Sequence, residues 1–315
     1  MQQDRPRISV VVCTRDRADD LKRALSGLQA QSFSGFEVIV VDQSRTDHTE
    51  RLVREFEHVL PTLRLVRQPQ PGLSRAYNRG VREAQADLIA FTDDDCLAPP
   101  DWLANIWTAF AGDARADLLY GQVLAPPEFD GTPTMGLIPL RAFAERVEVR
   151  RLRAFNGLGM GANFAAPRAA VERVGGFDEV LGGGGPLQST QDFDFAYRIL
   201  RTGGTIVLDP TVVAYHYGIR PAAEWPQLMG SYGVGLGGFY CKHIRLGDVR
   251  AAQLFAKAAY LAAGQALKAT ALKRPDARIK RRYATSMVLG AKKSFEFAID
   301  RRARLYIARP ATGVA

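Results

Sequence analysis

Short apolar runs alternate with amphipathic stretches through the first 95 residues, and this alternation limits the possible folds more than any other feature. Each apolar run has the length of a buried strand, and each amphipathic stretch repeats its apolar residues with helical spacing. Such alternation predicts a mostly parallel sheet with helices on both faces. The expected strands are residues 8–14, 36–44, 63–68 and 87–95, and the expected helices are 18–31, 49–57 and 73–85.

Polar residues follow the predicted strands at the point where each strand ends. Thr14 and Arg15 close the first strand, Asp42 lies near the end of the second, and Asp93 to Asp95 follow the fourth. In open α/β sheets, ligands bind outside the carboxyl ends of the strands. The sequence therefore predicts a ligand site at this edge of the sheet.

The three consecutive carboxylates in "IAFTDDDCLAPP" raise a question of charge, because each one makes its neighbour harder to ionise. One interpretation is an acidic turn at the surface, where water screens the repulsion. The other is a site for Mg²⁺ or Mn²⁺, ions that bind carboxylate oxygens and share their coordination shell with phosphates. The apolar run "DLIAF" places the triplet at the end of a core strand, and this favours the metal site.

A second group of candidates lies in "QDFDFAYRI" and "AYHYG". Asp192 and Asp194 stand at the start of a predicted helix, where carboxylates either cap the helix or serve as a general base. His216 ends an apolar run, so it is either a packed core residue or a metal or phosphate ligand. The residues alone leave both alternatives open.

Several classes of protein are not supported by the sequence. The three cysteines are Cys13, Cys96 and Cys241, and their spacing argues against a disulfide framework and a thiolate zinc site. The glycines of "GVGLGG", residues 233–238, lack a preceding strand, so they do not form a dinucleotide-binding loop. The chain also lacks the P-loop, zincin and hydrolase motifs.

Basic charge is concentrated at the C-terminal end. Residues 242–315 carry 17 Lys and Arg against four acidic residues, a net charge of +13, whereas the preceding 241 residues carry a net charge of −4. The composition changes near residue 220, so we predict one domain over 1–220 and a basic, mainly helical extension over 221–315. This extension is either a solvated basic face or an attachment to an anionic membrane surface.

The cellular location is predicted from two further stretches. The first residues lack the apolar segment of a signal peptide, and the run 258–267 lies between Lys257 and Lys268 and is too short to span a bilayer. We therefore expect a cytoplasmic protein without a transmembrane helix. If the basic extension binds lipid, it would attach the protein peripherally to the inner face of the membrane.

Taken together, the motifs resemble the inverting family 2 glycosyltransferases with the GT-A fold. The resemblance covers roughly residues 7–220. It implies a Rossmann-like, mostly parallel sheet with helices on both faces. The motifs that carry it are "VVVCTRDRADDLKRALSGLQAQ", "EVIVVDQSRTDHT", "PGLSRAYNRGVREAQADLIAFTDDDCLAPPDWL", "GANFAAPRAAVERVGGFDE" and "QDFDFAYRILRTG".

The resemblance implies a nucleotide-sugar site with a metal ion. Asp93 and Asp95 match the metal-binding D-x-D pair, with Asp94 facing the sugar or ribose, and His216 matches a position that supplies a further metal ligand in some relatives. The residues implied in nucleotide binding are Thr14, Arg15, Asp42, Arg75 and Asn78.

The resemblance also implies the residues around the transferred sugar. Asn163 matches a residue near the donor sugar and the acceptor, and Asp192 matches the catalytic base. The family commonly has Glu before this base, whereas this chain has Gln191. The amide keeps the size of Glu but not its charge, so an acceptor contact through that carboxylate is lost.

The implied activity is transfer of a sugar from a nucleotide-diphosphate sugar to an acceptor hydroxyl, with Mg²⁺ or Mn²⁺ as cofactor. The product would be a polysaccharide, a glycolipid or another glycoconjugate, made on a glycan or a lipid-linked acceptor. One alternative is a sugar-1-phosphate nucleotidyltransferase, but "CTRDRADD" lacks the glycine-rich loop of that class. A nucleic-acid-binding protein is another alternative, and it would leave the aspartates without a role.

Overall fold

The computed structural model describes residues 5–60, 62–112, 115–129, 139–152 and 158–308, and the chain divides into two compact units. The first unit comprises Met1–Pro71, Arg75–Gly176 and Ala196–Arg220. The second unit comprises Gly72–Ser74, Phe177–Phe195 and Pro221–Ala315. Its part from the middle of the chain includes the four consecutive glycines 182–185 and the first residues of the helix that carries Asp192.

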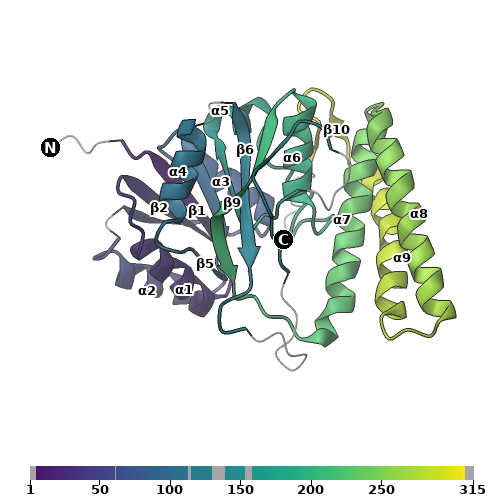
Figure 1. Cartoon of the computed structure of the whole chain (residues 1–315), viewed down its shortest axis with the longest axis horizontal. Coiled ribbons are helices and arrows are strands. Elements are labelled where there is room, and N and C mark those ends of the chain that lie inside the picture. The colour runs from purple at the N-terminus through teal and green to yellow at the C-terminus, as the bar shows by residue number, and fades with distance from the viewer. Residues whose placement is uncertain (1–4, 61, 113–114, 130–138, 153–157, 309–315) are drawn as a thin grey trace, which may run out of the picture. The chain divides into compact units, whose positions relative to one another are not determined.

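The first unit is built on a sheet in the order β3-β2-β1-β4-β8-β6-β9-β5, with β7 paired to β9 (Figure 1). β1 is parallel to β2 and β4, β2 to β3, and β6 to β9, whereas β5, β7 and β8 pair antiparallel with their neighbours. The strands are β1 (Ile8–Thr14), β2 (Phe36–Asp42), β3 (Leu63–Arg67), β4 (Leu88–Asp93), β5 (Cys96–Leu97), β6 (Ala116–Leu124), β7 (Val147–Val149), β8 (Asn163–Pro167) and β9 (Thr205–His216).

Helices cover both faces of this sheet, which confirms the predicted fold class. Buried residues of α1, α2 and α4 form one core with alternate residues of β1 and β2. On the opposite face, the ring of Tyr77 in α3 meets Phe91 edge-on at 5.2 Å between centroids, and a Cβ on Gly80 would lie 2.4 Å from Val11. The helices are α1 (Ala18–Gln29), α2 (His48–Phe56), α3 (Leu73–Glu83), α4 (Trp102–Gly112), α5 (Arg168–Arg173) and α6 (Gln191–Arg201).

The sequence of residues 140–155, "LRAFAERVEVRRLRAF", predicts a helix or a mixed segment. Its described part, 140–152, contains no helix; instead Val147–Val149 forms β7, antiparallel to β9, and Arg141 pairs with Val123. The sequence "RVEVR" alternates apolar and charged residues, which suits a half-buried strand. Pairing with the edge of β9 therefore decides the conformation of this short segment.

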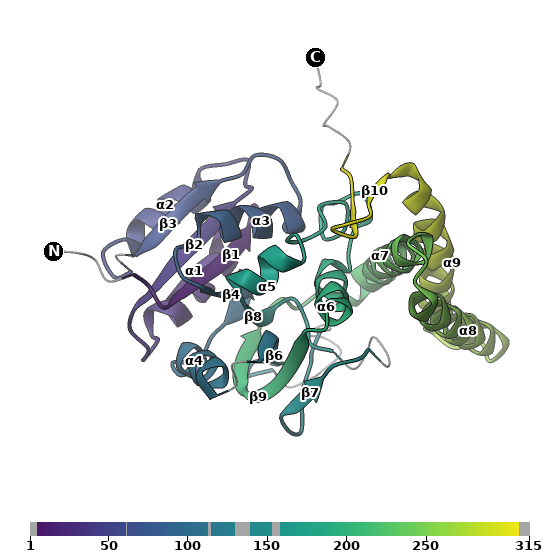
Figure 2. The same ribbon diagram turned by 90° about the horizontal axis from the view of Figure 1, so that it is seen from above.

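The second unit contains three long helices, α7 (Trp225–Arg245), α8 (Val249–Ala271) and α9 (Ala277–Lys293), which lie side by side in both views (Figures 1 and 2). α7 and α9 approach closely at glycines: a Cβ on Gly237 would lie 1.9 Å from the Met287 carbonyl, and one on Gly290 equally close to that of Val234. Gly233 and Gly237 therefore serve the packing of α7 against α9, whereas Gly235 and Gly238 face the segment 187–190. The short elements are η2 (Ala222–Glu224), η3 (Ser294–Glu296), β10 (Ile299–Asp300) and β11 (Leu305–Tyr306).

A bilayer-spanning helix was not expected, and within the described part of the chain no helix combines the length and the hydropathy that crossing a membrane requires.

Candidate functional site

The ends of three parallel strands bring predicted site residues to one edge of the sheet. The register aligns Thr14 with Asp42 between β1 and β2, and Cys13 with Asp93 between β1 and β4. Thr14 and Asp42 are buried, and Asp93 is half-buried. The edge predicted from strand ends therefore exists in the structure and carries these side chains.

The aspartate triplet is mostly buried, so it is not an acidic surface turn. Asp94 is 1% exposed and Asp95 is 3% exposed. Arg17 lies against both carboxylates: its guanidinium donates two hydrogen bonds to Asp94 and one of 3.1 Å to Asp95 Oδ2. A single cationic side chain thus faces two buried carboxylates.

Burial and the charge of Arg17 shift the pKa of Asp94 in opposite directions. Burial raises the pKa of Asp94 to about 6, although the neighbouring Arg17 acts to lower it. Arg17 loses hydration here, but the carboxylates outweigh that loss and raise its pKa. Because one guanidinium serves two carboxylates, the edge retains an excess of negative charge that a divalent cation could neutralise.

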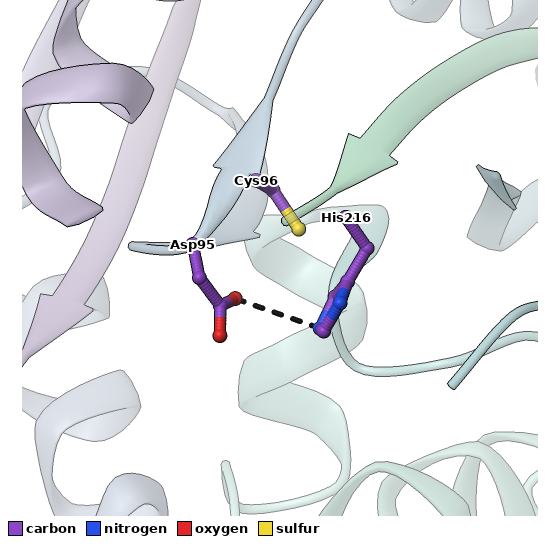
Figure 3. A group of neighbouring side chains, drawn as sticks. All are labelled: Asp95, Cys96 and His216. Carbon is purple, nitrogen blue, oxygen red and sulfur yellow. Dashed lines mark ion pairs between the residues drawn. The ribbon is translucent and has the colours of Figure 1, made fainter. Parts of the chain in front are cut away.

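Asp95 and His216 lie together with Cys96, and Figure 3 shows their side chains converging. The potential ligand atoms of these three residues lie within 4.8 Å of one another, and Asp95 Oδ1 is 3.5 Å from His216 Nε2. The antiparallel register of β5 and β9 sets Cys96 opposite His216. The structure thus brings together two predicted metal ligands, whereas Asp93 is outside this group.

The chemistry of these atoms fits a metal ion. Asp95 Oδ1 and His216 Nδ1 are buried and have no hydrogen-bond partner among the described residues. Burial lowers the pKa of His216, which keeps the imidazole neutral, as a metal ligand must be. Burial also raises the pKa of the Cys96 thiol, so it stays protonated and binds metals weakly. A carboxylate with an imidazole suits Mn²⁺ better than Mg²⁺, which prefers oxygen ligands.

Gly218 lies so close to Asp95 and His216 that a larger residue would not fit at this position. A Cβ there would lie 2.5 Å from both Asp95 Oδ2 and His216 Cε1. The Tyr217 amide also donates a hydrogen bond of 2.7 Å to the Asp95 carbonyl. The end of β9 and the start of β5 are therefore held together at this group of candidate metal ligands.

Asp42 is paired with a residue that the sequence did not single out. Arg67, at the end of β3, donates to the buried Asp42 carboxylate, and the Ser44 amide donates to the same group at 2.8 Å. Arg15, in contrast, is exposed. Arg67 and Arg17, rather than Arg15, contact the carboxylates of this edge.

The residues predicted in α3 and β8 differ in exposure. Arg75 and Asn78 are half-buried. The Asn163 side chain is fully buried: its oxygen accepts from Trp102 Nε1 at 2.9 Å, and its nitrogen donates to the Gln122 and Val212 carbonyls. These bonds bridge the register shift between β6 and β9. Asn163 therefore supports the strands and presents no exposed atom to a sugar in this structure.

The two aspartates at the start of α6 have different environments within the second unit. Asp192 is half-buried, and its Oδ1 accepts a hydrogen bond from the Phe193 amide. Asp194 is fully buried and contacts Lys242 and His243. Of this pair, Asp192 is the partly exposed residue and therefore the one that a substrate could reach.

Several residues that contact the predicted candidates were not singled out from the sequence: Arg17, Arg67 and Cys96 in the first unit, and Lys242 and His243 in the second. Arg17 and Asp94 are 77 residues apart, so no local spacing connects them. The available signal was the second arginine of "TRDR", which follows the first strand and lies at the same sheet edge as the acidic triplet.

Comparison with known proteins identifies relatives of one kind. The family model "Glycosyl transferase family 2" matches residues 9–176. The chain is 31% identical over 246 residues to the validoxylamine A glucosyltransferase of Streptomyces hygroscopicus subsp. jinggangensis, covering 70% of this chain and 56% of that protein. It is 25% identical over 228 residues to the glycosyltransferase AglE of Haloferax volcanii, covering 71% of this chain and 70% of AglE. The chain thus spans about half the length of the validoxylamine relatives.

Solved structures share the fold. A mannosyltransferase from Pyrobaculum calidifontis, in complex with GDP-Man and Mn²⁺, superposes with a TM-score of 0.62 at 23% identity, covering 92% of this chain and 87% of that chain. S. aureus TarS residues 1–349, in complex with UDP, give a TM-score of 0.55 at 20% identity, covering 73% and 65%. These likenesses support the same mixed α/β architecture.

The pairing of Arg17 with buried carboxylates predicts a pH-dependent cost of removing it. Arg17→Met should lower the free energy of unfolding by about 1–3 kcal/mol at about pH 8, where Asp94 is ionised. The cost should be smaller at about pH 5, because Asp94 is then protonated and needs no cation. Urea denaturation at both pH values measures the difference.

Arg15→Met is the matched control, since Arg15 is exposed and two positions away; its cost should stay within about 0.5 kcal/mol. Equal costs for the two variants, or a cost of Arg17→Met that does not change with pH, would contradict the pairing.

Proposed function

Because the chain belongs to glycosyl transferase family 2, we propose that it transfers a sugar from a nucleotide-diphosphate sugar to an acceptor hydroxyl, with inversion at the sugar C1. The observation that carries this proposal is the buried group of Asp94, Asp95 and His216 at the carboxyl edge of the sheet. Asp95 Oδ1 and His216 Nδ1 in this group have no hydrogen-bond partner in the part of the chain that the structure describes. An acceptor in polysaccharide, glycolipid or other glycoconjugate synthesis fits this activity.

A divalent cation at this edge would neutralise charge that develops on the diphosphate leaving group. Asp95 and His216 are the residues that would hold it, with Asp93 at the neighbouring strand end as a further carboxylate. Mn²⁺ is our first choice and Mg²⁺ the second, because the group includes an imidazole. The solved mannosyltransferase complex with Mn²⁺ supports the use of such an ion in this fold.

The nucleotide would bind along the same edge. Thr14, Asp42 and Arg15 follow β1 and β2, and Arg75 and Asn78 are half-buried on α3. Asp42 is already oriented by Arg67 and Ser44, so its remaining acceptor capacity is fixed in direction. The relatives solved with GDP-Man and UDP indicate that this fold accepts a purine or a pyrimidine.

Asp192 is the proposed general base. It would accept the proton of the acceptor hydroxyl while the acceptor oxygen bonds to the sugar C1 and the bond from C1 to the diphosphate oxygen breaks. The half-buried carboxylate at the start of α6 suits this role, because a base must be open to the substrate. This single displacement inverts C1.

We further propose that the second unit binds an anionic membrane surface through α8. Val249, Tyr260 and Leu267 are 70%, 79% and 71% exposed, and their spacing places them on one face of the helix. Arg250, Lys257 and Lys268 lie along one flank of this stripe, and α8 contains no acidic residue. An apolar stripe bordered by cations complements an anionic lipid surface.

Two other functional classes are less well supported. Family membership favours sugar transfer over the sugar-1-phosphate nucleotidyltransferase alternative. A basic binding protein without catalysis would need neither the unsatisfied ligand atoms at Asp95 and His216 nor the half-buried Asp192.

Replacing the proposed base should separate catalysis from binding. Asp192→Asn is expected to lower kcat by roughly 10²- to 10⁴-fold, because the amide cannot accept the proton, while donor affinity stays unchanged. Transfer from radiolabelled UDP- and GDP-sugars measures the rate. Asp19→Asn, an exposed aspartate in α1, is the control and should keep full activity; activity retained by Asp192→Asn would rule out the base assignment.

Removing the proposed metal ligand should affect donor binding first. Asp95→Ala is expected to reduce the affinity for UDP or GDP in Mn²⁺ to the value measured without metal, because the ion would lose a protein ligand that holds it at this edge. Isothermal titration with and without Mn²⁺ gives both values, and Asp101→Ala, an exposed aspartate, is the control. A variant that kept the full Mn²⁺ dependence would show that Asp95 is not a ligand.

The membrane proposal predicts lipid selectivity. The wild-type chain should float with vesicles that contain phosphatidylglycerol and not with neutral phosphatidylcholine vesicles. Tyr260→Ser with Leu267→Ser should weaken binding roughly tenfold or more, since burying one large apolar side chain contributes about 1.5–3 kcal/mol. Val59→Ser with Leu140→Ser, two exposed apolar residues of the first unit, is the control.

Equal flotation with both vesicle types would overturn the membrane proposal. Light scattering tests the alternative that a second copy of the chain covers the apolar stripe. Self-association of the wild-type chain that the α8 variant abolishes would also overturn the membrane proposal.

A further inference from the structure

We propose that His243 and Lys242, two neighbouring residues of α7, position the base Asp192 by holding Asp194 two residues further along α6. This inference rests on the proposed function, because it assigns a role to residues that act through Asp192. Contacts within the second unit carry the argument.

Asp194 belongs to a fully buried group of charged residues. Its Oδ1 lies 2.6 Å from Lys242 Nζ and 3.0 Å from His243 Nε2, and all three side chains are 0% exposed. Lys242 Nζ also donates to Asp178 Oδ2 at 2.6 Å. Buried charges have a defined geometry only when hydrogen-bond partners satisfy them. Here the Lys242 ammonium and an N–H of the His243 ring both contact one carboxylate oxygen.

The protonation of His243 is fixed by its other neighbour. Arg304 Nη2 lies 3.5 Å from His243 Nδ1, and arginine can only donate, so Nδ1 is the acceptor. The ring proton is therefore on Nε2, which donates to Asp194. Burial lowers the pKa of His243 to about 4, so the ring is neutral at physiological pH. The contact with Asp194 is thus a directed hydrogen bond from one tautomer.

The position of Asp194 determines the direction in which Asp192 points. Residues two apart on an α-helix project about 200° apart around its axis. With Asp194 held inside the second unit, the Asp192 carboxylate must face nearly the opposite way, and it is half-buried there. A rotation of the first turn of α6 that released Asp194 would turn Asp192 as well.

The chain before α6 needs this restraint, because it enters the helix through strained backbone. Gln188 and Thr190 have φ values of +66° and +76°, in the left-handed region that non-glycine residues rarely adopt. Ser189 Oγ donates to the Ser231 carbonyl of α7 at 2.9 Å. A Cβ on Gly235 of α7 would lie 2.0 Å from Ser189 Oγ. α7 therefore contacts this segment both before and after Asp192.

The sharpest test uses His243, because Lys242→Met leaves two buried carboxylates without a cation and can prevent folding. His243→Leu removes the hydrogen bond to Asp194, whereas His243→Gln keeps a side-chain N–H near the Nε2 position. The expected result is a fall in kcat of about 10- to 100-fold for His243→Leu with an unchanged KM for the donor, and recovery of most of this loss in His243→Gln. The rates are scaled to the folded fraction measured by circular dichroism.

The pH profile distinguishes positioning from general loss of structure. If His243 acts through Asp192, His243→Leu should move the acidic limb of the kcat profile, because the base changes its surroundings. A structural role alone would lower the amplitude and leave the limb in place. His58→Leu, at an exposed histidine of the first unit, is the control and should change neither quantity.

The two proposals fail separately. An active Asp192→Asn variant overturns the base assignment, and with it the route by which His243 would act. If Asp192→Asn is inactive, the base assignment stands. The positioning role is then overturned if the acidic limb of His243→Leu does not move, or if the folded fraction alone explains the kcat of that variant.

Discussion

Parallel pairing of β1 with β2 and β4 is the constraint on which the rest of the first unit depends. The main-chain hydrogen bonds align the strand ends, so the first polar residues after each apolar strand meet at one edge. The strands are buried on both faces, and polar side chains can reach solvent only where the strands stop. The gathering of polar side chains at this edge is therefore a consequence of the sheet itself.

Two clusters of buried ionisable side chains in this protein differ in how many of their polar atoms have hydrogen-bond partners. At Asp95 and His216, a carboxylate oxygen and a ring nitrogen are buried with no hydrogen-bond partner among the described residues. Around Lys242, in contrast, Asp178 also accepts from the Val180 and Tyr306 amides. Unsatisfied buried atoms are costly and indicate a ligand, whereas a satisfied network indicates a rigid support. The same residue types thus suit the proposed ligand binding in one unit and the proposed positioning of Asp192 in the other.

Local patterns were sufficient to predict β1 to β4 and the polar residues at their ends. Thr14, Asp42 and Asp93 follow apolar runs, so their place at the sheet edge could be predicted from periodicity and from the behaviour of parallel sheets. Contacts between residues far apart in the sequence could not be predicted in this way. Asp94 contacts Arg17, which is 77 residues away, and Asp194 contacts His243, which is 49 residues away. No spacing rule connects such partners, because tertiary packing alone brings them together.

The repulsion between neighbouring carboxylates also explains why a glutamine, Gln191, precedes the proposed base. Gln191 is 8% exposed, and its Cβ would lie 3.3 Å from a Cβ on Gly182, so the side chain is packed at the start of α6. A glutamate here would bury another negative charge beside Asp192 and within three residues of Asp194, which raises the cost of ionising each. The neutral amide avoids that cost. The charge open to a substrate at the start of α6 is therefore that of Asp192, and an acceptor that relied on a second carboxylate would lose that contact.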